Sequence, residues 1–399
     1  MACRSGLLAW RGRLEPMDAD VVGAVNELTG RWVRSLGPGN TVVSGLGLWP
    51  LLAILATAAD EPGRAELAAA AQVAAADGSR LAVQLIDALD ESADLHAALG
   101  VWVSEQLKLA ESFGEVVPAP VVGMLTGQSA VDKPKLDAWT TEHTDGLIRE
   151  MPVVIDPDVM LVLASALCLR TTWARPFTEQ IKRLQGDWAG SWHWLERTDH
   201  DLDSVRRYDD LTVITVRGDA DVDVLLGLGS GDVVGGLLDA AGRPADGVPG
   251  SALIEGSGEV APGVQIGKTT SARPDVRLSL PSFQVSSSHD LLESAELFGL
   301  SAVTSNPGER GHFSAISPAP LAIGQAKQEV LARFFATGFE AAAVTTMAMT
   351  RAAMVTRHER RLDVVLDRPF AFAAVLRESR LPIVAGWINS PTEAGRTAD

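Results

Sequence analysis

Histidines and cysteines are the side chains that most often bind metals or act as bases and nucleophiles, and this chain has seven histidines and two cysteines. No histidine pair has the HExxH spacing, and His193 with His200 does not match a zinc-binding pattern. Cys3 and Cys168 have no partner at metal-ligand spacing and are too few for a disulfide scaffold. We therefore expect no metal site, and we expect all of these histidines at the surface: His96, His143, His193, His200, His289, His312 and His358.

Three short motifs resemble catalytic or ion-binding sequences, but each is incomplete. Ser44 lies in VVSGLG, which lacks the flanking residues of a GxSxG nucleophile elbow. The GSG sequence at 229–231 lacks the Gly-Lys-Ser/Thr of a phosphate loop. Asp199, Asp201 and Asp203 lack the glycine and the terminal glutamate of a calcium loop. Since no catalytic constellation remains, we predict a protein that is not an enzyme and that needs no cofactor.

Composition and charge exclude several classes of protein. Of the 399 residues, 46% are hydrophobic and 21% are charged, so a large folded core is expected rather than a disordered or fibrous chain. The formal net charge of −17, without any basic cluster, disfavours nucleic acid and anionic membranes as partners. The uncharged stretch 40–59 has the length of a membrane span, about 20 residues. Gly45, Gly47 and Pro50 interrupt it, so we expect a short buried strand followed by a buried helix.

The N-terminus does not resemble a secretion signal. Its apolar stretch, residues 6–10, is too short and runs directly into Arg11 and Arg13. Met17 begins a more conventional start, so we expect residues 1–16 to be a disordered leader. The missing signal predicts a cytoplasmic location.

The remaining pattern mixes helices and strands without a βαβ rhythm, which indicates one large α+β domain. Helical periodicity or composition predicts helices over 21–32, 50–59, 63–76, 81–89 and 135–149. Strands are expected over 99–108, 158–169, 276–285, 327–335, 364–374 and 383–388, with a hairpin over 211–229. The segment 229–275 is rich in Gly, Pro and Asp and is predicted to be variable loop.

The C-terminal third contains four blocks in a distinctive order: GFEAAAVT at 338–345, a polar aperiodic loop at 346–361, LDRPFAF at 366–372 and VAGWINSP at 384–391. Alone, the alanine run at 341–343 also fits the start of a helix. Together the blocks resemble the serpin family, in which a hinge of the form GTEAAAAT, a reactive loop, a DxPFxF strand and a terminal MGxVxxP follow one another. Earlier blocks extend the resemblance over nearly the whole chain: 41–44, 136–148, 163–177, 276–290 and 312–317.

The resemblance implies a single serpin-like domain over residues 17–392, with three β-sheets, surrounding helices and an exposed reactive-centre loop at about 337–361, followed by a tail at 393–399. It implies a monomeric inhibitor that a serine protease cleaves as a pseudo-substrate and that traps this protease as a covalent acyl-enzyme. Many family members are extracellular, which is the alternative location. The hinge that would enter the central sheet comprises Gly338, Phe339, Glu340, Ala341, Ala342, Ala343, Val344 and Thr345. Ala341 and Ala343 are suited to an inward position because they are small.

The reactive centre follows from the family's usual hinge-to-cleavage distance. Counting from Gly338 places the acyl-donating residue at Ala352, with Arg351 before it and Ala353 after it. The segment from Gly338 to Pro369 is several residues longer than is usual in the family, so Met354 and Arg357 are alternatives.

The sequence departs from the family at the hinge and beneath it. Phe339 stands where the family prefers Thr or Ser, and we expect its ring to slow or block insertion. This favours a second hypothesis, a non-inhibitory protein of the same fold that binds a partner or is merely cleaved. Ala336 replaces an acidic residue, whereas Trp173 retains the tryptophan of the region called the breach. Ser44, Ser165 and Gln328 replace the polar residues of the region called the shutter, and we expect smaller or apolar packing there.

Overall fold

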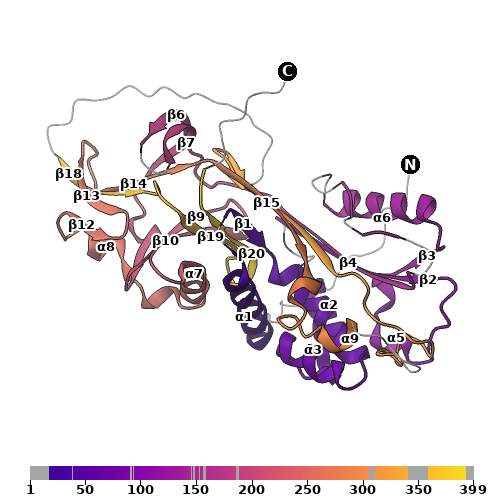
Figure 1. Ribbon diagram of the computed structural model, residues 1–399. Helices are drawn as coiled ribbons and strands as arrows, with labels where there is room; N and C mark the ends of the chain where they lie inside the picture. Colours follow the sequence, from indigo (N-terminus) through magenta and orange to yellow (C-terminus); the bar gives the residue numbers. More distant parts are fainter. Residues whose placement is uncertain are drawn as a thin grey trace, which may run out of the picture.

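The computed structural model describes residues 18–339 and 358–391, except for 38, 90, 91, 93, 145, 147, 148, 152, 156–158, 186, 187 and 305–310. The predicted leader at 1–16, the tail at 393–399, the hinge from Glu340 to Thr345 and the reactive centre at 351–353 lie outside the described residues. Figure 1 shows an elongated molecule in which two groups of helices and strands are joined by long strands.

The first two helices of the chain each begin at a polar capping residue. The Asp18 carboxylate accepts the Asp20 backbone N–H at 2.9 Å, and the Ser44 hydroxyl accepts that of Gly47 at 3.0 Å. The helix after Ser44 is buried at every residue except Thr57, as expected for an uncharged stretch. The helices are α1 (Ala19–Ser35), α2 (Gly45–Ala58), α3 (Gly63–Ala71), α4 (Gly78–Leu89), α5 (Phe113–Val116), α6 (Ser129–His143), α7 (Val233–Gly242), α8 (Gly250–Leu253) and α9 (Ser301–Thr304). No helix in the described ranges is long and apolar enough to cross a membrane.

Two large sheets form one half of the molecule. The first has the order β1 (Thr41–Val43), β20 (Pro382–Ile388), β19 (Phe370–Leu376), β10 (Val222–Gly229), β9 (Leu211–Arg217), β8 (Val205–Tyr208) and β11 (Val248–Pro249). Every residue of β19 is buried, so this sheet passes through the core. The second has the order β12 (Glu259–Ala261), β13 (Val264–Thr269), β18 (Glu359–Val365), β14 (Asp275–Pro281), β7 (Gly190–Asp199) and β6 (Thr178–Leu184).

The central sheet is divided into two parts. One part has the order β15 (Phe283–Asp290), β16 (Lys327–Phe334), β17 (Gly338–Phe339) and β5 (Thr171–Thr172). The other has the order β3 (Val122–Leu125), β2 (Leu95–Ser104) and β4 (Leu161–Leu169). Only Arg170 separates β4 from β5 along the chain, yet in the described part of the protein no ladder joins β4 to β16. Instead of the three sheets expected, hydrogen bonding therefore defines four.

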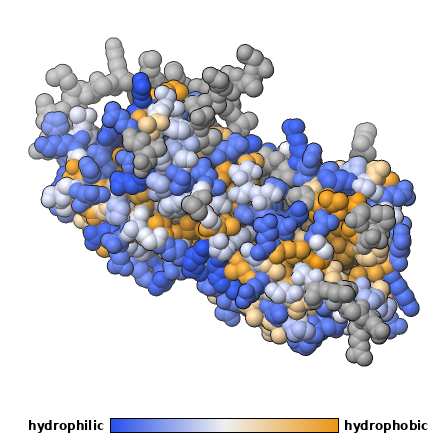
Figure 2. Space-filling view, in the orientation of Figure 1, coloured by the Kyte–Doolittle hydropathy of each residue, from blue (hydrophilic) through white to orange (hydrophobic). Residues whose placement is uncertain are grey.

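The divided sheet is covered on both faces. Helix α6 lies against β2 and β4 on one face, and its side chains form a separate core that includes Trp102, Leu136 and Val162. On the other face α2 contacts β4, and α4 contacts β2 (Figure 1). In the same orientation, Figure 2 shows hydrophobic side chains, in orange, at the surface of the half that holds this sheet.

Several sequence predictions of element boundaries are wrong. The helix predicted at 135–149 starts earlier and ends at His143, and the strand predicted at 99–108 is β2 at 95–104. The predicted strands 276–285 and 364–374 are each two strands, since the strand pairing is interrupted at Ser282 and at 366–369. The supposed loop 229–275 contains α7, α8 and three strands, because its Gly, Pro and Asp residues form tight connections between short elements.

Candidate functional site

The first two described residues of the predicted hinge already form a strand of the central sheet. In β17, Gly338 pairs with Thr172, while Phe339 pairs with Thr171 of β5 on one side and with Phe334 of β16 on the other. Both pairings are antiparallel. The loop therefore begins inside the central sheet, where β17 lies between β5 and β16. Below β17, no ladder joins β4 to β16 in the described part of the protein.

The Phe339 side chain is 2% exposed and lies within the core. Its ring centroid is 6.5 Å from that of Phe372 on β19, in an aromatic cluster that also contains Phe283, Phe334 and Trp173. The ring therefore already occupies a packed strand position, and its expected effect on the insertion of the rest of the hinge stays a prediction. The core beneath β17 is built of large rings, so it accommodates a benzyl group as one more member.

A glycine is required beside it because β17 lies very close to β5. A Cβ atom added at Gly338 would lie 2.3 Å from the Thr171 carbonyl oxygen. The Gly338 carbonyl also accepts the Phe335 N–H at 2.9 Å, which closes the turn between β16 and β17.

Trp173 holds this turn, as expected for a breach residue. Its indole Nε1–H donates to the Phe335 carbonyl at 2.8 Å, and its backbone N–H donates to Thr337 at 3.0 Å. The Phe177 N–H donates to the Ala336 carbonyl at 2.8 Å. Backbone carbonyls of the turn are therefore fixed by N–H donors, even though Ala336 offers no side-chain charge.

The expectation of smaller or apolar packing at the shutter is wrong for Gln328. This side chain is 7% exposed, its Oε1 accepts the Ser44 N–H at 3.1 Å and its Nε2 donates to the Ser44 carbonyl at 3.0 Å. The Ser44 hydroxyl in turn donates to the Ile383 carbonyl at 2.7 Å. The polar network is rebuilt around an amide that satisfies both backbone groups. Ser165 of β4 pairs with Leu99 of β2, and the Ser165 side chain lies outside the described part of the protein.

Below the hinge strand, a groove of about 650 Å³ lies beside β16. One wall is the segment after α6, with residues 149–151, 153 and 154, and the other is formed by Ser286, Glu329, Val330 and Leu331. Gln325 clamps the segment across the sheet, since its side-chain amide donates to the Val154 carbonyl at 2.8 Å and accepts the Val154 N–H at 3.0 Å. This clamp ties the segment between α6 and β4 to the segment that immediately precedes β16.

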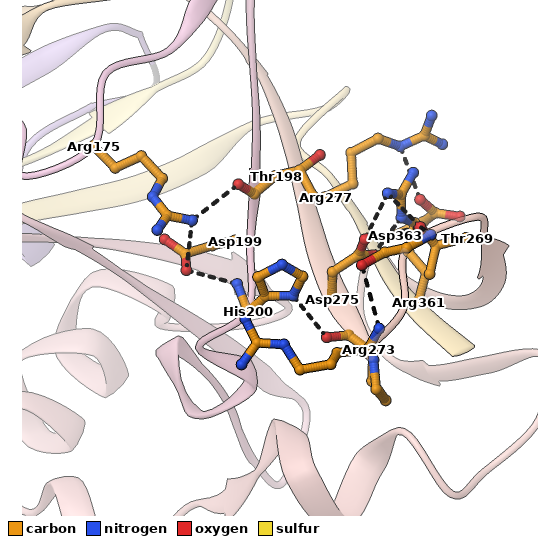
Figure 3. Close-up of polar contacts among 12 residues, drawn as sticks. Arg175, Thr198, Asp199, His200, Thr269, Arg273, Asp275, Arg277, Arg361 and Asp363 are labelled. Atoms are coloured by element: carbon orange, nitrogen blue, oxygen red, sulfur yellow. Dashed lines mark hydrogen bonds and ion pairs between the residues drawn. The ribbon is translucent and has the colours of Figure 1, made fainter. Parts of the chain in front are cut away.

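The C-terminal end of the loop is anchored by ion pairs. β18 lies between β13 and β14, and Arg361 Nε is 2.6 Å from Asp275 Oδ1, whose side chain is 1% exposed (Figure 3). Hydrogen bonding to Asp275 raises the pKa of Arg361 above its ordinary value. Arg277 pairs with Asp363 at 2.9 Å on the same strands. Sequence reasoning missed this anchor because its partners are far apart in the chain.

An acidic pair lies next to the hinge strand. Burial raises the pKa of the Asp94 carboxyl above 3.8, the neighbouring Asp221 raises it further, and a hydrogen bond from Thr171 opposes both effects. One carboxylate oxygen of Asp94 and one of Asp221 are buried and have no hydrogen-bond partner among the described residues. Since Thr171 pairs with Phe339, Asp94 touches the strand that holds the hinge.

Comparison with known sequences gives one consistent family. A family model described as Serpin (serine protease inhibitor) matches residues 26–188 and 264–391. Serpin-Z2B of Oryza sativa subsp. japonica is 25% identical over 396 residues, covering 88% of this chain and 92% of the rice protein. Alpha-1-antitrypsin 1-1 of Mus musculus is 23% identical over 321 residues, covering 78% and 71%.

Solved structures share the same fold. The native state of the thermophilic serpin tengpin aligns with a TM-score of 0.70 at 17% identity, covering 94% of this chain and 95% of tengpin. Thyroxine-binding globulin in complex with thyroxine aligns with a TM-score of 0.64 at 16% identity, covering 94% and 99%.

We predict that Phe339→Ala releases the hinge strand and lowers the free energy of unfolding by about 3–5 kcal/mol, since it empties a buried ring position. Thermal or denaturant unfolding measures the loss, and hydrogen exchange of peptides covering 335–339 should become faster. Phe335→Ala is the matched control, because Phe335 is only half-buried. Equal effects of the two substitutions would contradict the docking role of Phe339.

We predict that Asp94→Asn raises stability at pH 7. A raised pKa means that the folded state favours the neutral carboxyl, so the wild-type free energy of unfolding falls as pH rises from 3.8 through the higher folded-state pKa. The variant keeps an acceptor for Thr171 and should lack that fall. Melting temperatures measured from pH 3.5 to 7 test this, with Asp87→Asn on the exposed face of α4 as the control. A parallel pH profile for Asp94→Asn and wild type would refute the prediction.

Proposed function

This chain belongs to the serpin family, and from that premise we propose that it inhibits a serine protease by presenting its loop as a substrate that traps the enzyme. The observation that carries the proposal is β17, a two-residue loop strand at the top of a sheet whose halves are unpaired below it in the described part of the chain. An extended segment added there would gain backbone hydrogen bonds on both sides.

The register of β17 specifies how the hinge would continue. Phe339 pairs with Thr171 on one side and with Phe334 on the other, and both pairings are antiparallel. Each step forward along the hinge would therefore be matched by one step backward along β5 and β4, and by one step backward along β16. Ala343 would therefore pair with Leu167 of β4 and with Val330 of β16. Thr345 would lie between Ser165 and Gln328, at the shutter.

The side-chain alternation agrees with this register. Phe339, Val330 and Leu169 are buried on the core side of their strands. By the same parity we expect Ala341, Ala343 and Thr345 to point inward, where small side chains avoid overpacking. Leu161, the residue of β4 farthest from the hinge, would pair with position 349 in this register. A cut after Ala352 would free enough chain to fill the whole length of β4.

The proposed reaction is an acyl transfer that stops at the acyl-enzyme. The protease serine oxygen attacks the Ala352 carbonyl, an ester bond forms, and the Ala353 amine leaves with a proton. Insertion of the freed segment would then carry the attached protease away before water can hydrolyse the ester. On the other side of the cut, the Arg361–Asp275 anchor holds β18 in place.

A second candidate function is a non-inhibitory protein of the same fold. The fold similarity to thyroxine-binding globulin supports it, because that protein is known in complex with a small molecule. The docked Phe339 removes the main sequence argument for this alternative, since its ring already occupies the sheet.

We predict an SDS-stable complex with a serine protease and a cut between Ala352 and Ala353. Incubation with trypsin-like and elastase-like proteases, followed by gel electrophoresis and mass spectrometry, measures both. Ala352→Arg should shift inhibition toward a trypsin-like enzyme, whereas Arg351→Ala should not, if Ala352 donates the acyl group. Cleavage without any complex would support the non-inhibitory alternative, and cleavage outside 349–357 would overturn the assigned reactive centre.

We also predict the inserted register. With Cys3 and Cys168 replaced by serine, Ala343→Cys combined with Leu167→Cys should form a disulfide only after loop cleavage, since paired antiparallel positions bring Cβ atoms within about 5.5 Å. Ala343→Cys with Ala166→Cys is the matched control, because residue 166 is one position away from the predicted partner, Leu167, along β4. A disulfide in the control pair alone would show a different register.

A further inference from the structure

Strand β6 (Thr178–Leu184) is an open edge of the second large sheet. It pairs with β7 on one side and ends the strand order on the other, and no backbone hydrogen bond reaches its outer side from the part of the chain that the structure describes. Figure 1 shows the β6–β7 hairpin at the margin of the molecule. The outer N–H and C=O groups of β6 can therefore pair with another extended segment.

The edge is exposed over most of its length. Ile181, at the centre of the strand, is 62% exposed, although isoleucine is a residue type that is usually buried. Residues 178–180 before it and Arg183 after it are exposed, as are residues 174–176 and 185 beyond the ends of the strand. The described residues that flank the edge therefore leave it open to an approaching strand.

The sequence of β6, TEQIKRL, is complementary to itself in the antiparallel direction. When two copies of the strand pair about a two-fold axis at Ile181, Glu179 of each copy lies opposite Arg183 of the other. Gln180 of each copy then lies opposite Lys182 of the other. Opposite charges face each other twice, the two isoleucines meet at the axis, and no like charges are opposed.

The charged side chains of the edge are placed for this pairing. Glu179 Oε1 contacts His193 Nδ1 of β7, and a carboxylate can accept a second donor at its other oxygen. Arg183 has no ion-pair partner among the described residues. Lys182 lies on the other face of the strand, with its Nζ 4.3 Å from the centre of the Trp194 ring, so it does not compete for Glu179.

A second copy of this chain is the partner that this pattern fits. The net charge of −17 makes two copies repel each other, but β6 carries two basic residues and one acidic residue, so acidic surfaces do not meet at this edge. We propose that two molecules pair through β6 into a symmetric dimer whose sheet continues across the interface. A two-fold contact is closed, so association stops at the dimer. The contact of one strand with another is smaller than the roughly 1,200 Å² of a standard interface, so the dimer is reversible.

Sedimentation velocity of the full chain at about 0.15 M NaCl tests the dimer. Between about 5 and 500 µM protein, a range that covers weak reversible complexes, the wild type should change from monomer to dimer. Ile181→Lys places two like charges at the axis and should stay monomeric at every concentration. Val131→Lys on α6 is the matched control and should dimerise as the wild type does. The two side chains are 62% and 48% exposed, so both variants should melt as the wild type does.

Charge reversal tests the register. Glu179→Arg places arginine opposite arginine, and Arg183→Glu places glutamate opposite glutamate, so each variant alone should dimerise about 10-fold more weakly than the wild type. Mixed in equal amounts, the two variants should form a heterodimer, because each arginine then faces a glutamate of the other copy. A chain that carries both substitutions should dimerise as the wild type does.

The proposal is overturned if the wild type stays monomeric up to the highest concentration, if Ile181→Lys dimerises as the wild type does, or if the two charge-reversed variants do not associate with each other. Association beyond a dimer would also overturn it, because a closed two-fold contact leaves no second edge to pair. Strand β6 contains no residue of the proposed trapping mechanism, so the outcome does not depend on whether this chain inhibits a protease.

Discussion

The arrangement of this protein depends on two strands that run through one sheet without pairing to each other. β4 and β16 are the inner edges of the divided sheet in the described part of the chain. Strand edges present N–H and C=O groups that bind any extended segment. The surrounding contacts follow from that constraint: α6 covers one face, Gln325 ties the segment before β16 to the segment before β4, and β17 lies between β5 and β16 at the top of the opening.

The hinge strand is held by packing and the loop's far end by charge. Phe339 is docked through an aromatic cluster, and the turn before it through backbone hydrogen bonds from Trp173. Arg361 is fixed through a buried carboxylate, Asp275. Apolar contacts can be exchanged for other apolar contacts when a strand shifts, whereas loss of one partner from a buried ion pair is strongly destabilising. Insertion would therefore proceed from the hinge while β18 stays in place.

At the shutter, where the sequence departs from the family pattern, another side chain supplies the polar contact. Gln328 binds both backbone groups of Ser44, so a buried amide rebuilds the polar contact. Near the hinge, Asp94 and Asp221 each keep an unpartnered buried oxygen, which concentrates unfavourable charge where β5 must hold the loop. A local energetic cost of this kind is a common property of functional sites.

Sequence order alone determined the family and the α+β class, because several short blocks with characteristic residue types occur in the right succession. It also identified β16, the β9–β10 hairpin and the buried helix α2, whose periodicity or composition is local. Tertiary structure alone decided that Phe339 lies inside the core, that Gln328 reaches Ser44 and that Arg361 meets Asp275. Those contacts join residues that are far apart in the chain. Whether a buried position can hold a large aromatic ring depends on the space between strands that are distant in sequence, and that space is set by the packing of the folded core.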